Sequence, residues 1–492
     1  MAKFEDKNSF KGRRENMASN PEAINNSASE IWFRSEDQAL LQKKQIFTTV
    51  RLGDRKDGLC ENKGCYIPGS FVMVKIFKDK DRNHFSGWET EIVIINNEIK
   101  TMAELEDSDL KLGPPNQRKK TDLLKKLSNF YGREISEKEV ISIIHFEYLE
   151  NLKSMADLIS AKVLTYAKLP PANPEHLDFE KLTVPLIEHD YMAKTPIMWN
   201  SAYQEFGIKT GNVMLIGNPA YSQQILQVLR QDPKYIGGGA GVGFKDEAIK
   251  YLDELDPLAK AIGSINFILK TPEGKLKGFN TDGLGYALSL ADRFKARGQE
   301  LKGKKAVILG AGGTGNAIAF ALANEGMKLV ILNRTVQKAE NLCQGINECY
   351  QLVANQQVRF GGEDQIAKEV QDADVVINVS TKGATGEMER YNALASANLP
   401  ASVENIQANL MQANAVLQTI SQKAIISDIV LTKEPTPFLK SAQKAGFETL
   451  GGIPMVVNQG VEAFWLLHGK ELQQKNIAKE QVARIMKKAA GL

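Results

Sequence analysis

The sequence predicts an α/β protein with a Rossmann-type domain, and three features that follow one another in the chain support this. Residues 306–309 form an apolar run with the length and β-branched content of a buried parallel strand. Gly310, Gly312 and Gly315 follow in G-x-G-x-x-G order, and a helical pattern begins behind them. A second apolar run, at residues 329–332, closes the strand–helix–strand unit at the spacing of a dinucleotide-binding fold.

The turns of this unit predict the cofactor. The glycines let the backbone approach a pyrophosphate at the N-terminus of the helix. An NAD enzyme places an acid after the second strand, whereas this chain has Arg334 there. Arginine suits a bidentate phosphate contact, so NADP is expected, and the alternative is a solvated arginine at a strand end. The expected cofactor contacts are Gly310, Ala311, Gly312, Gly313, Thr314, Gly315, Asn333, Arg334, Thr335 and Lys338.

Composition places the chain among ordinary soluble proteins. It has 492 residues, of which 43% are hydrophobic and 25% charged, and its net charge is +3. This length predicts about two or three domains, and the charge argues neither for nor against a nucleic-acid partner. No apolar run reaches membrane-spanning length, and the polar start lacks the apolar core of a signal peptide. A cytoplasmic protein without membrane contact is expected.

The four cysteines are too few for a disulfide framework. Cys60 and Cys65 could begin a metal site, but no second Cys or His pair at zinc spacing follows them. Two unlinked thiols are therefore the preferred interpretation, and no metal is predicted.

The predicted organisation places a smaller domain before the α/β module. Residues 1–35 are expected to form a disordered tail, and residues 36–150 a small β-barrel-like α+β domain. A long helical pattern from residue 147 leads into a Pro-rich segment, so residues 151–181 are expected to be a helical linker. The expected strands lie at 45–52, 70–77, 91–95, 140–146, 213–216 and 265–269, and the expected helices at 119–131, 223–229 and 246–255.

Residues 36–150 resemble the ASCH family, a small barrel related to the PUA RNA-binding fold. The likeness is carried by Thr49 and Arg51, by Gly69 before the strand at 71–74, and by the apolar run that closes the block. It implies RNA or a nucleoside as partner. Some family members resemble enzymes that act on acylated nucleosides with a Lys three residues before a Thr, and this chain has Ile46 at that position. The basic residues of 118–126 could form an RNA-binding surface, but a solvated helix face is favoured.

Residues 182–492 resemble shikimate dehydrogenases through a series of motifs in the family's order. These lie at residues 195–200, 237–245, 259–266, 278–283, 374–380 and 451–459. The resemblance implies a discontinuous α/β substrate domain at 182–285 and 457–492 around an NADP-binding Rossmann domain at 286–456. It also implies oxidation of a cyclic hydroxy acid or reduction of the corresponding keto acid, as in aromatic amino acid biosynthesis, by a monomer or homodimer.

The same resemblance assigns residue roles. Hydride transfer to a ketone creates an alkoxide that must be protonated as it forms. The family pattern implies that Lys245 moves this proton and that Asp282 orients it; the alternative is an ordinary surface salt bridge. The implied substrate contacts are Thr195, Asn266 and Gln459, and the implied further cofactor contacts are Ser380 and Gly452.

Departures from the family pattern concern the substrate. Ala193, Gly241 and Leu431 stand where the family has three hydroxyl groups around the carboxylate of shikimate, and Trp199 replaces a His. The catalytic pair is retained, so an enzyme with an altered or larger substrate is expected. The alternatives are an NADP(H)-sensing regulatory or RNA-binding protein, and a nucleoside amidohydrolase built on the N-terminal block.

Overall fold

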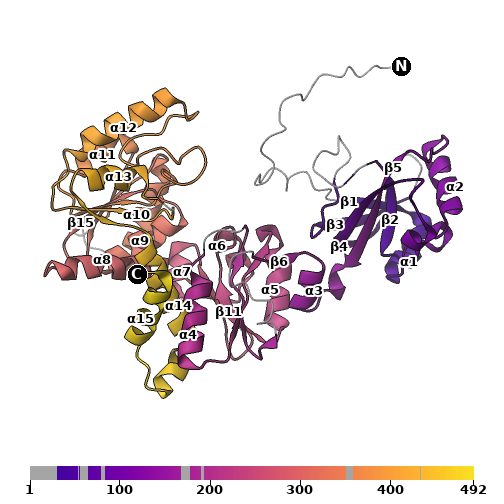
Figure 1. Cartoon of the computed structure of the whole chain (residues 1–492), viewed down its shortest axis with the longest axis horizontal. Coiled ribbons are helices and arrows are strands. Elements are labelled where there is room, and N and C mark those ends of the chain that lie inside the picture. The colour runs from indigo at the N-terminus through magenta and orange to yellow at the C-terminus, as the bar shows by residue number, and fades with distance from the viewer. Residues whose placement is uncertain are drawn as a thin grey trace. The chain divides into compact units, whose positions relative to one another are not determined.

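The computed structural model describes residues 30–53, 55, 65–78, 84–167, 178–189, 193–350, 358–432 and 434–492. It forms two compact units, Met1–Thr165 and Tyr166–Leu492 (Figure 1). Most of the predicted tail, the Pro-rich part of the predicted linker and Cys60 lie outside the described residues.

The first unit is built on a five-stranded sheet in the order β1-β3-β4-β5-β2. β1 runs parallel to β3, and the other neighbours are antiparallel. Along β5, Ile141 and Ile143 join the core on one face, whereas Ile144 and Phe146 join the core on the other, as the alternation of a strand requires. The elements are β1 Glu30–Arg34, α1 Gln38–Gln42, β2 Thr48–Leu52, β3 Phe71–Phe77, β4 Phe85–Thr101, α2 Lys120–Tyr131, β5 Val140–Tyr148 and α3 Met155–Ser160.

Three predictions for this unit are wrong. The tail does not extend to residue 35, because Ile31 and Phe33 are buried where β1 pairs with β3. The long helix from residue 147 is absent: Ser154 caps the short helix α3, Lys162 at φ 58° follows it, and β6 (Leu164–Tyr166) comes next. Cys65 takes part in a disulfide. Within the described residues no backbone ladder joins the sheet edges β1 and β2, and the ASCH-like barrel stays a prediction.

The second unit begins with a six-stranded mixed sheet in the order β12-β14-β13-β11-β7-β9. A short parallel pair, β8 with β10, lies beside it through a bridge between Leu186 and Ala240. The elements are β7 Leu182–Thr183, β8 Leu186–Ile187, α4 Thr195–Phe206, β9 Gly211–Asn212, β10 Leu215–Gly217, α5 Ser222–Gln231, β11 Tyr235–Gly239, α6 Phe244–Glu247, β12 Glu254–Leu255, α7 Pro257–Ile262, β13 Phe267–Lys270 and β14 Leu276–Phe279.

The helix predicted across 246–255 is also wrong. It is replaced by the short helix α6, a 3-10 turn at Ala248–Tyr251 and the strand β12. Arg230 explains the break, since its side chain donates to Tyr251 O at 3.0 Å and to Asp253 Oδ2 at 3.0 Å. These contacts fix the chain in an extended course after the turn.

A parallel sheet in the order β17-β16-β15-β18-β19-β20 confirms the predicted Rossmann-type fold. The strand order reverses between β15 and β18, so the crevice for a dinucleotide opens at their carboxyl ends. Separate apolar cores cover its two faces. The elements are α8 Asp282–Ala296, β15 Lys305–Leu309, α9 Gly313–Asn324, β16 Lys328–Leu332, α10 Val336–Tyr350, β17 Arg359–Gly361, α11 Ile366–Glu369, β18 Val375–Asn378, α12 Val403–Leu417, β19 Ile425–Asp428, α13 Pro437–Lys444 and β20 Glu448–Leu450.

The last two helices, α14 (Ile453–Gln474) and α15 (Lys479–Ala490), return to pack on α4 (Figure 1). Trp199, Phe464 and Met486 belong to one buried core there. Helix α8 packs tightly on two neighbours: a Cβ on Gly283 would lie 2.0 Å from Ala317 O of α9, and one on Gly285 would lie 2.6 Å from the backbone nitrogen of Gln459 in α14. No helix within the described ranges is long and apolar enough to cross a membrane.

Candidate active site

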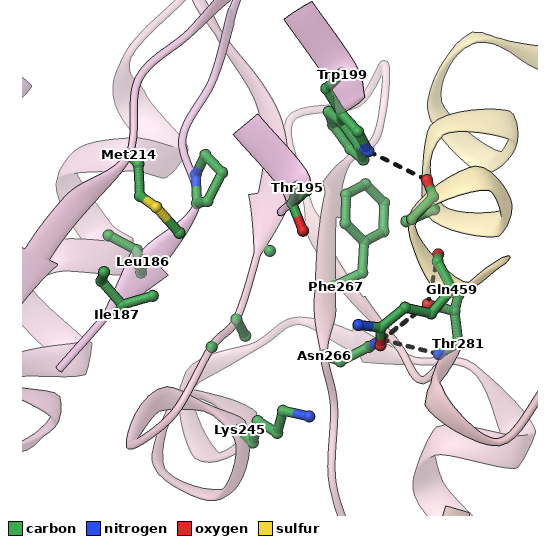
Figure 2. Close-up of a pocket in the computed structure, with 16 residues that line it drawn as sticks. Leu186, Ile187, Thr195, Trp199, Met214, Lys245, Asn266, Phe267, Thr281 and Gln459 are labelled. Carbon is green, nitrogen blue, oxygen red and sulfur yellow. Dashed lines mark hydrogen bonds between the residues drawn. The ribbon is translucent and has the colours of Figure 1, made fainter. Parts of the chain in front are cut away.

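A pocket of about 100 Å³ lies between the mixed sheet, α4 and the start of α14 (Figure 2). Its walls come from segments that are far apart in the sequence. The lining residues are Pro185, Leu186, Ile187, Thr195, Trp199, Met214, Gly239, Ala240, Gly241, Lys245, Asn266, Phe267, Thr281, Gln459, Gly460 and Ala463.

Lys245 and Asp282 meet at this pocket. Lys245 stands on α6, which begins after Gly243 at φ 83°; a Cβ at Gly243 would lie 2.6 Å from Pro219 Cγ and from Glu188 Oε2, so only glycine fits this turn. Asp282 is the first residue of α8, where the positive end of the helix dipole favours a carboxylate. Asp282 is 2% exposed, and Lys245 Nζ donates to its Oδ2. The pair is therefore a partly buried salt bridge and not a solvated one.

Asn266 joins this pair to the rest of the polar wall. Its Nδ2 lies 2.8 Å from Asp282 Oδ1, 2.9 Å from Thr281 Oγ1 and 3.0 Å from Gln459 Oε1. Its Oδ1 accepts a hydrogen bond from the backbone nitrogen of Thr281 at 2.8 Å. Asn280 shapes the turn by accepting from the Asp282 backbone nitrogen at 3.1 Å. The amide groups of Asn266 and Gln459 are thus held beside the carboxylate, where they can bind a substrate hydroxyl.

The opposite wall is apolar. Leu186, Ile187 and Met214 come from β8 and from the segment before β10, and all three are buried. Trp199 closes the top of the view in Figure 2, and its Nε1 donates to Gly460 O at 3.1 Å. Thr195, at the first position of α4, brings a hydroxyl to this side. The pocket therefore has one polar wall that can carry chemistry and one largely apolar wall.

The Gly-rich turn fits a dinucleotide. Gly310 has φ 125°, and a Cβ there would lie 3.0 Å from the Ser380 backbone nitrogen. A Cβ on Gly315 would lie 2.8 Å from Val379 Cγ2, whereas one on Gly312 would meet nothing within 4 Å. The turn therefore closes onto the loop after β18 and stays open at Gly312, directly before the N-terminus of α9. A pyrophosphate would be held there by the first backbone N–H groups of the helix.

The second turn carries the charge that distinguishes the cofactors. Asn333 accepts from the Ala311 backbone nitrogen at 3.2 Å and donates to Thr335 O at 2.9 Å, which ties the two turns together. Arg334 and Lys338 are exposed, and within the described ranges neither forms an ion pair. Both cations are thus available to a phosphate.

Two buried titratable residues, Lys382 and Asp428, lie after β18 and at the end of β19. Lys382 is paired with Glu363 at 2.8 Å, and burial lowers the pKa of Lys382. Ser380 donates its hydroxyl to Asn378 Oδ1 at 2.7 Å and accepts from the Lys382 backbone nitrogen at 3.3 Å, which leaves its oxygen one lone pair for a ribose hydroxyl. Burial also raises the pKa of Asp428 to about 6, and Asn378 donates to this carboxyl at 3.0 Å.

The structure brings the five predicted catalytic and substrate residues together, and the predicted cofactor contacts stay predictions. Lys245, Asn266, Thr195 and Gln459 line one pocket, and Asp282 contacts Lys245. Gly452 is not among the lining residues of this pocket; a Cβ there would lie 2.5 Å from Ile429 O, and its cofactor contact stays a prediction.

Sequence reasoning missed the apolar wall and one hydroxyl. Met214 lies in the run 213–216, which was predicted only as a strand, and Leu186 and Ile187 fall in no predicted element. Ser264 is 2% exposed, its Oγ has no partner within the described residues, and it lies 3.3 Å from where a Cβ of Gly313 would be. Ser264 lies inside the motif at residues 259–266 noted above, and its place in that motif was the available signal.

Known proteins match this part of the chain. Residues 190–268 match the family described as "Shikimate dehydrogenase substrate binding domain", and residues 291–393 match "Shikimate / quinate 5-dehydrogenase". The shikimate dehydrogenase (NADP(+)) of Halothermothrix orenii is 31% identical over 276 residues, which cover 56% of this chain and 86% of that protein. The enzyme of the same name from Methanocaldococcus jannaschii is 31% identical over 295 residues, covering 58% and 89%.

The fold agrees with these matches. A crystal structure of a shikimate dehydrogenase in complex with NADP+ has a TM-score of 0.51 and 26% identity, and the alignment covers 62% of this chain and 94% of that chain. In this chain, the motifs noted in the sequence, the parallel sheet and the polar wall of the pocket all lie in the unit Tyr166–Leu492. The chain therefore belongs to the shikimate dehydrogenase family.

Proposed function

We propose that this chain is an NADP-dependent oxidoreductase that interconverts a ring alcohol and the corresponding ketone. The observation that carries the proposal is the contact of Lys245 with Asp282 at a pocket whose polar wall also presents Asn266 and Gln459. The relatives named above are NADP-dependent shikimate dehydrogenases, which makes shikimate and 3-dehydroshikimate the first compounds to test.

The residues divide the work as follows. NADPH, when bound, supplies the hydride. Lys245 donates a proton to the oxygen of the ketone as negative charge develops there, and removes it in the reverse direction. Asp282 keeps the ammonium group pointed at this oxygen. Asn266 and Gln459 bind a neighbouring hydroxyl, and the closely packed helix α8 keeps these groups in register.

The domain boundaries remain part of the proposal. We assign 182–285 and 457–492 to substrate binding and 286–456 to cofactor binding, because α14 and α15 pack on α4 and the parallel sheet holds the Gly-rich turn. The family matches begin at residue 190 and give no support to a role for the N-terminal unit in binding RNA or a nucleoside. That role stays a prediction.

The test is the turnover of Lys245→Met. With NADPH and 3-dehydroshikimate, or any ring ketone that the unchanged protein reduces, the variant should lose about 10²–10⁴ in kcat and keep its affinity for NADPH. Lys250→Met is the matched control, because Lys250 lies on the next turn and pairs only at the surface with Glu247. Turnover of Lys245→Met equal to that of Lys250→Met would exclude Lys245 as the proton donor.

A further inference from the structure

We propose that the substrate of this pocket carries an uncharged group at the end of the ring that faces away from Lys245. This rests on the proposed function and narrows its substrate class. The substrate would be a neutral cyclic hydroxy ketone or polyol, in contrast to shikimate, whose ring bears a carboxylate.

The pocket fixes which end of a ring meets which wall. The reacting oxygen must lie at Lys245, and a neighbouring hydroxyl must reach Asn266 or Gln459, since these amides flank the catalytic carboxylate. Figure 2 shows Asn266 and Gln459 on one side of the pocket, Met214, Leu186 and Ile187 on the other, and Lys245 at the bottom with its side chain directed toward the amide side. The far end of a bound ring therefore faces the apolar wall.

The apolar wall offers little to an anion. Leu186 and Ile187 are 1% exposed and Met214 is 3% exposed, so they form a packed surface rather than mobile side chains. The indole nitrogen of Trp199 already donates to Gly460 O and is not free to bind a substrate. Among the described lining residues on this side, Thr195 supplies the one polar side chain. An ionised carboxylate removed from water against such a wall lacks the partners that would compensate its desolvation.

The charges around the pocket point the same way. Lys245 is the one cationic residue among the described lining residues, and Asp282 already balances it. Glu188 adds an acidic group beside the turn that carries Lys245, because its Oε2 lies 2.6 Å from where a Cβ of Gly243 would be. Among the described lining residues, a substrate carboxylate would therefore meet no cation that is not already paired.

The N-terminus of α4 is the feature that would favour an anion. Its positive end lies at Thr195, but Pro196 at the second position has no N–H to donate. The hydroxyl of Thr195 binds a neutral hydroxyl or amide as readily as a carboxylate. The helix end alone therefore does not outweigh the apolar wall and Glu188.

A matched pair of compounds tests the proposal on the unchanged protein. 3-Dehydroshikimate and its methyl ester differ in the charge at the far end of the ring, and kcat/KM with NADPH is measured for both. The ester should be preferred by about tenfold or more, the scale of one charged contact. A preference for the acid would overturn the inference and leave the proposed function intact.

If the protein reduces neither 3-dehydroshikimate nor its ester, binding measurements test the inference instead. Calorimetric Kd values for shikimate and methyl shikimate, measured in the presence of NADP+, should show the ester binding more tightly, and tighter binding of the acid would again overturn the inference. A protein that binds NADP+ and reduces neither 3-dehydroshikimate, its ester nor any member of a panel of neutral ring ketones would refute the proposed function instead.

A charge placed on the wall gives an independent measurement. Met214→Lys replaces one unbranched side chain by another and adds an ammonium group, so the ester-to-acid ratio should fall by about tenfold or more. Met214→Gln is the neutral control of similar length and should keep the ratio of the unchanged protein. If Met214→Lys folds, binds NADP+ and leaves the ratio unchanged, the far end of the ring does not face this wall and the inference fails.

Discussion

Replacing Arg334 with glutamine isolates the proposed cofactor preference. Arg334 is exposed and makes no ion pair within the described ranges, so its removal leaves no buried group unpaired and should not disturb the fold. Asn333 holds the turn through contacts that the substitution leaves in place. A change in cofactor binding would therefore report the lost contact itself.

The expected magnitude follows from the chemistry of that contact. A charge-assisted hydrogen bond to a phosphate contributes roughly 1.5–3 kcal/mol. Solvent exposure of Arg334 and the presence of Lys338 favour the lower part of this range. Arg334→Gln should thus raise the Kd for NADP+ by about one to two decades and leave the Kd for NAD+ nearly unchanged.

The assay compares the binding of NADP+ and of NAD+ to the unchanged protein, to Arg334→Gln and to a control variant, Arg293→Gln. Arg293→Gln removes an exposed arginine near the end of α8, which leads toward the start of β15, whereas Arg334 follows the carboxyl end of β16. Kd values for NADP+ and NAD+ are measured by calorimetry for the three proteins, at two salt concentrations. Equal losses for the two cofactors, or a loss shared by Arg293→Gln, would refute the idea that Arg334 binds the 2′-phosphate.

Three further predictions concern catalysis, packing and pH. Asp282→Asn should lower kcat by about 10²–10⁴, because the positioned partner of Lys245 is lost, while NADP+ affinity measured by calorimetry should hold. Gly283→Ala should cost about 1–3 kcal/mol or more in a urea titration, because its Cβ would lie 2.0 Å from a backbone oxygen of α9. Burial lowers the pKa of His468 to about 4 from its ordinary 6.5, so the native state resists protonation that the unfolded chain accepts. Stability should fall by roughly 3 kcal/mol as pH drops from 6.5 to 4, and a urea titration of His468→Gln should show a smaller fall across that window.

The sequence predicted best what depends on short local patterns. The strand, the Gly-rich turn and the second strand lie within one continuous stretch, and the parallel sheet is confirmed. Lys245, Asn266 and Asp282 were assigned from the family resemblance; the structure places them in contact, and their roles stay predictions.

Longer-range packing explains the misses. The apolar wall is made where two-residue strands meet segments distant in the sequence, and no periodicity marks such contacts. Ile31 and Phe33 become a strand only because β3 lies beside them. The helix expected from residue 147 does not form, because β5 continues to Tyr148 and Lys162 adopts a left-handed backbone conformation after the short helix α3. That conformation has no signature in a lysine. Cys65 forms a disulfide although the spacing of its neighbours gave no reason to expect one.

The tight seating of α8 has a consequence for how this enzyme could diversify. Because glycines bring α8 against both α9 and α14, the proton-transfer groups and the cofactor turn share one rigid frame. Leu186, Ile187 and Met214 stand on β8 and on the segment before β10, outside that frame. Substitutions there can reshape what the enzyme accepts while the distance between hydride donor and acceptor stays fixed. A few substitutions in this apolar wall would therefore let the same reaction act on new metabolites during evolution.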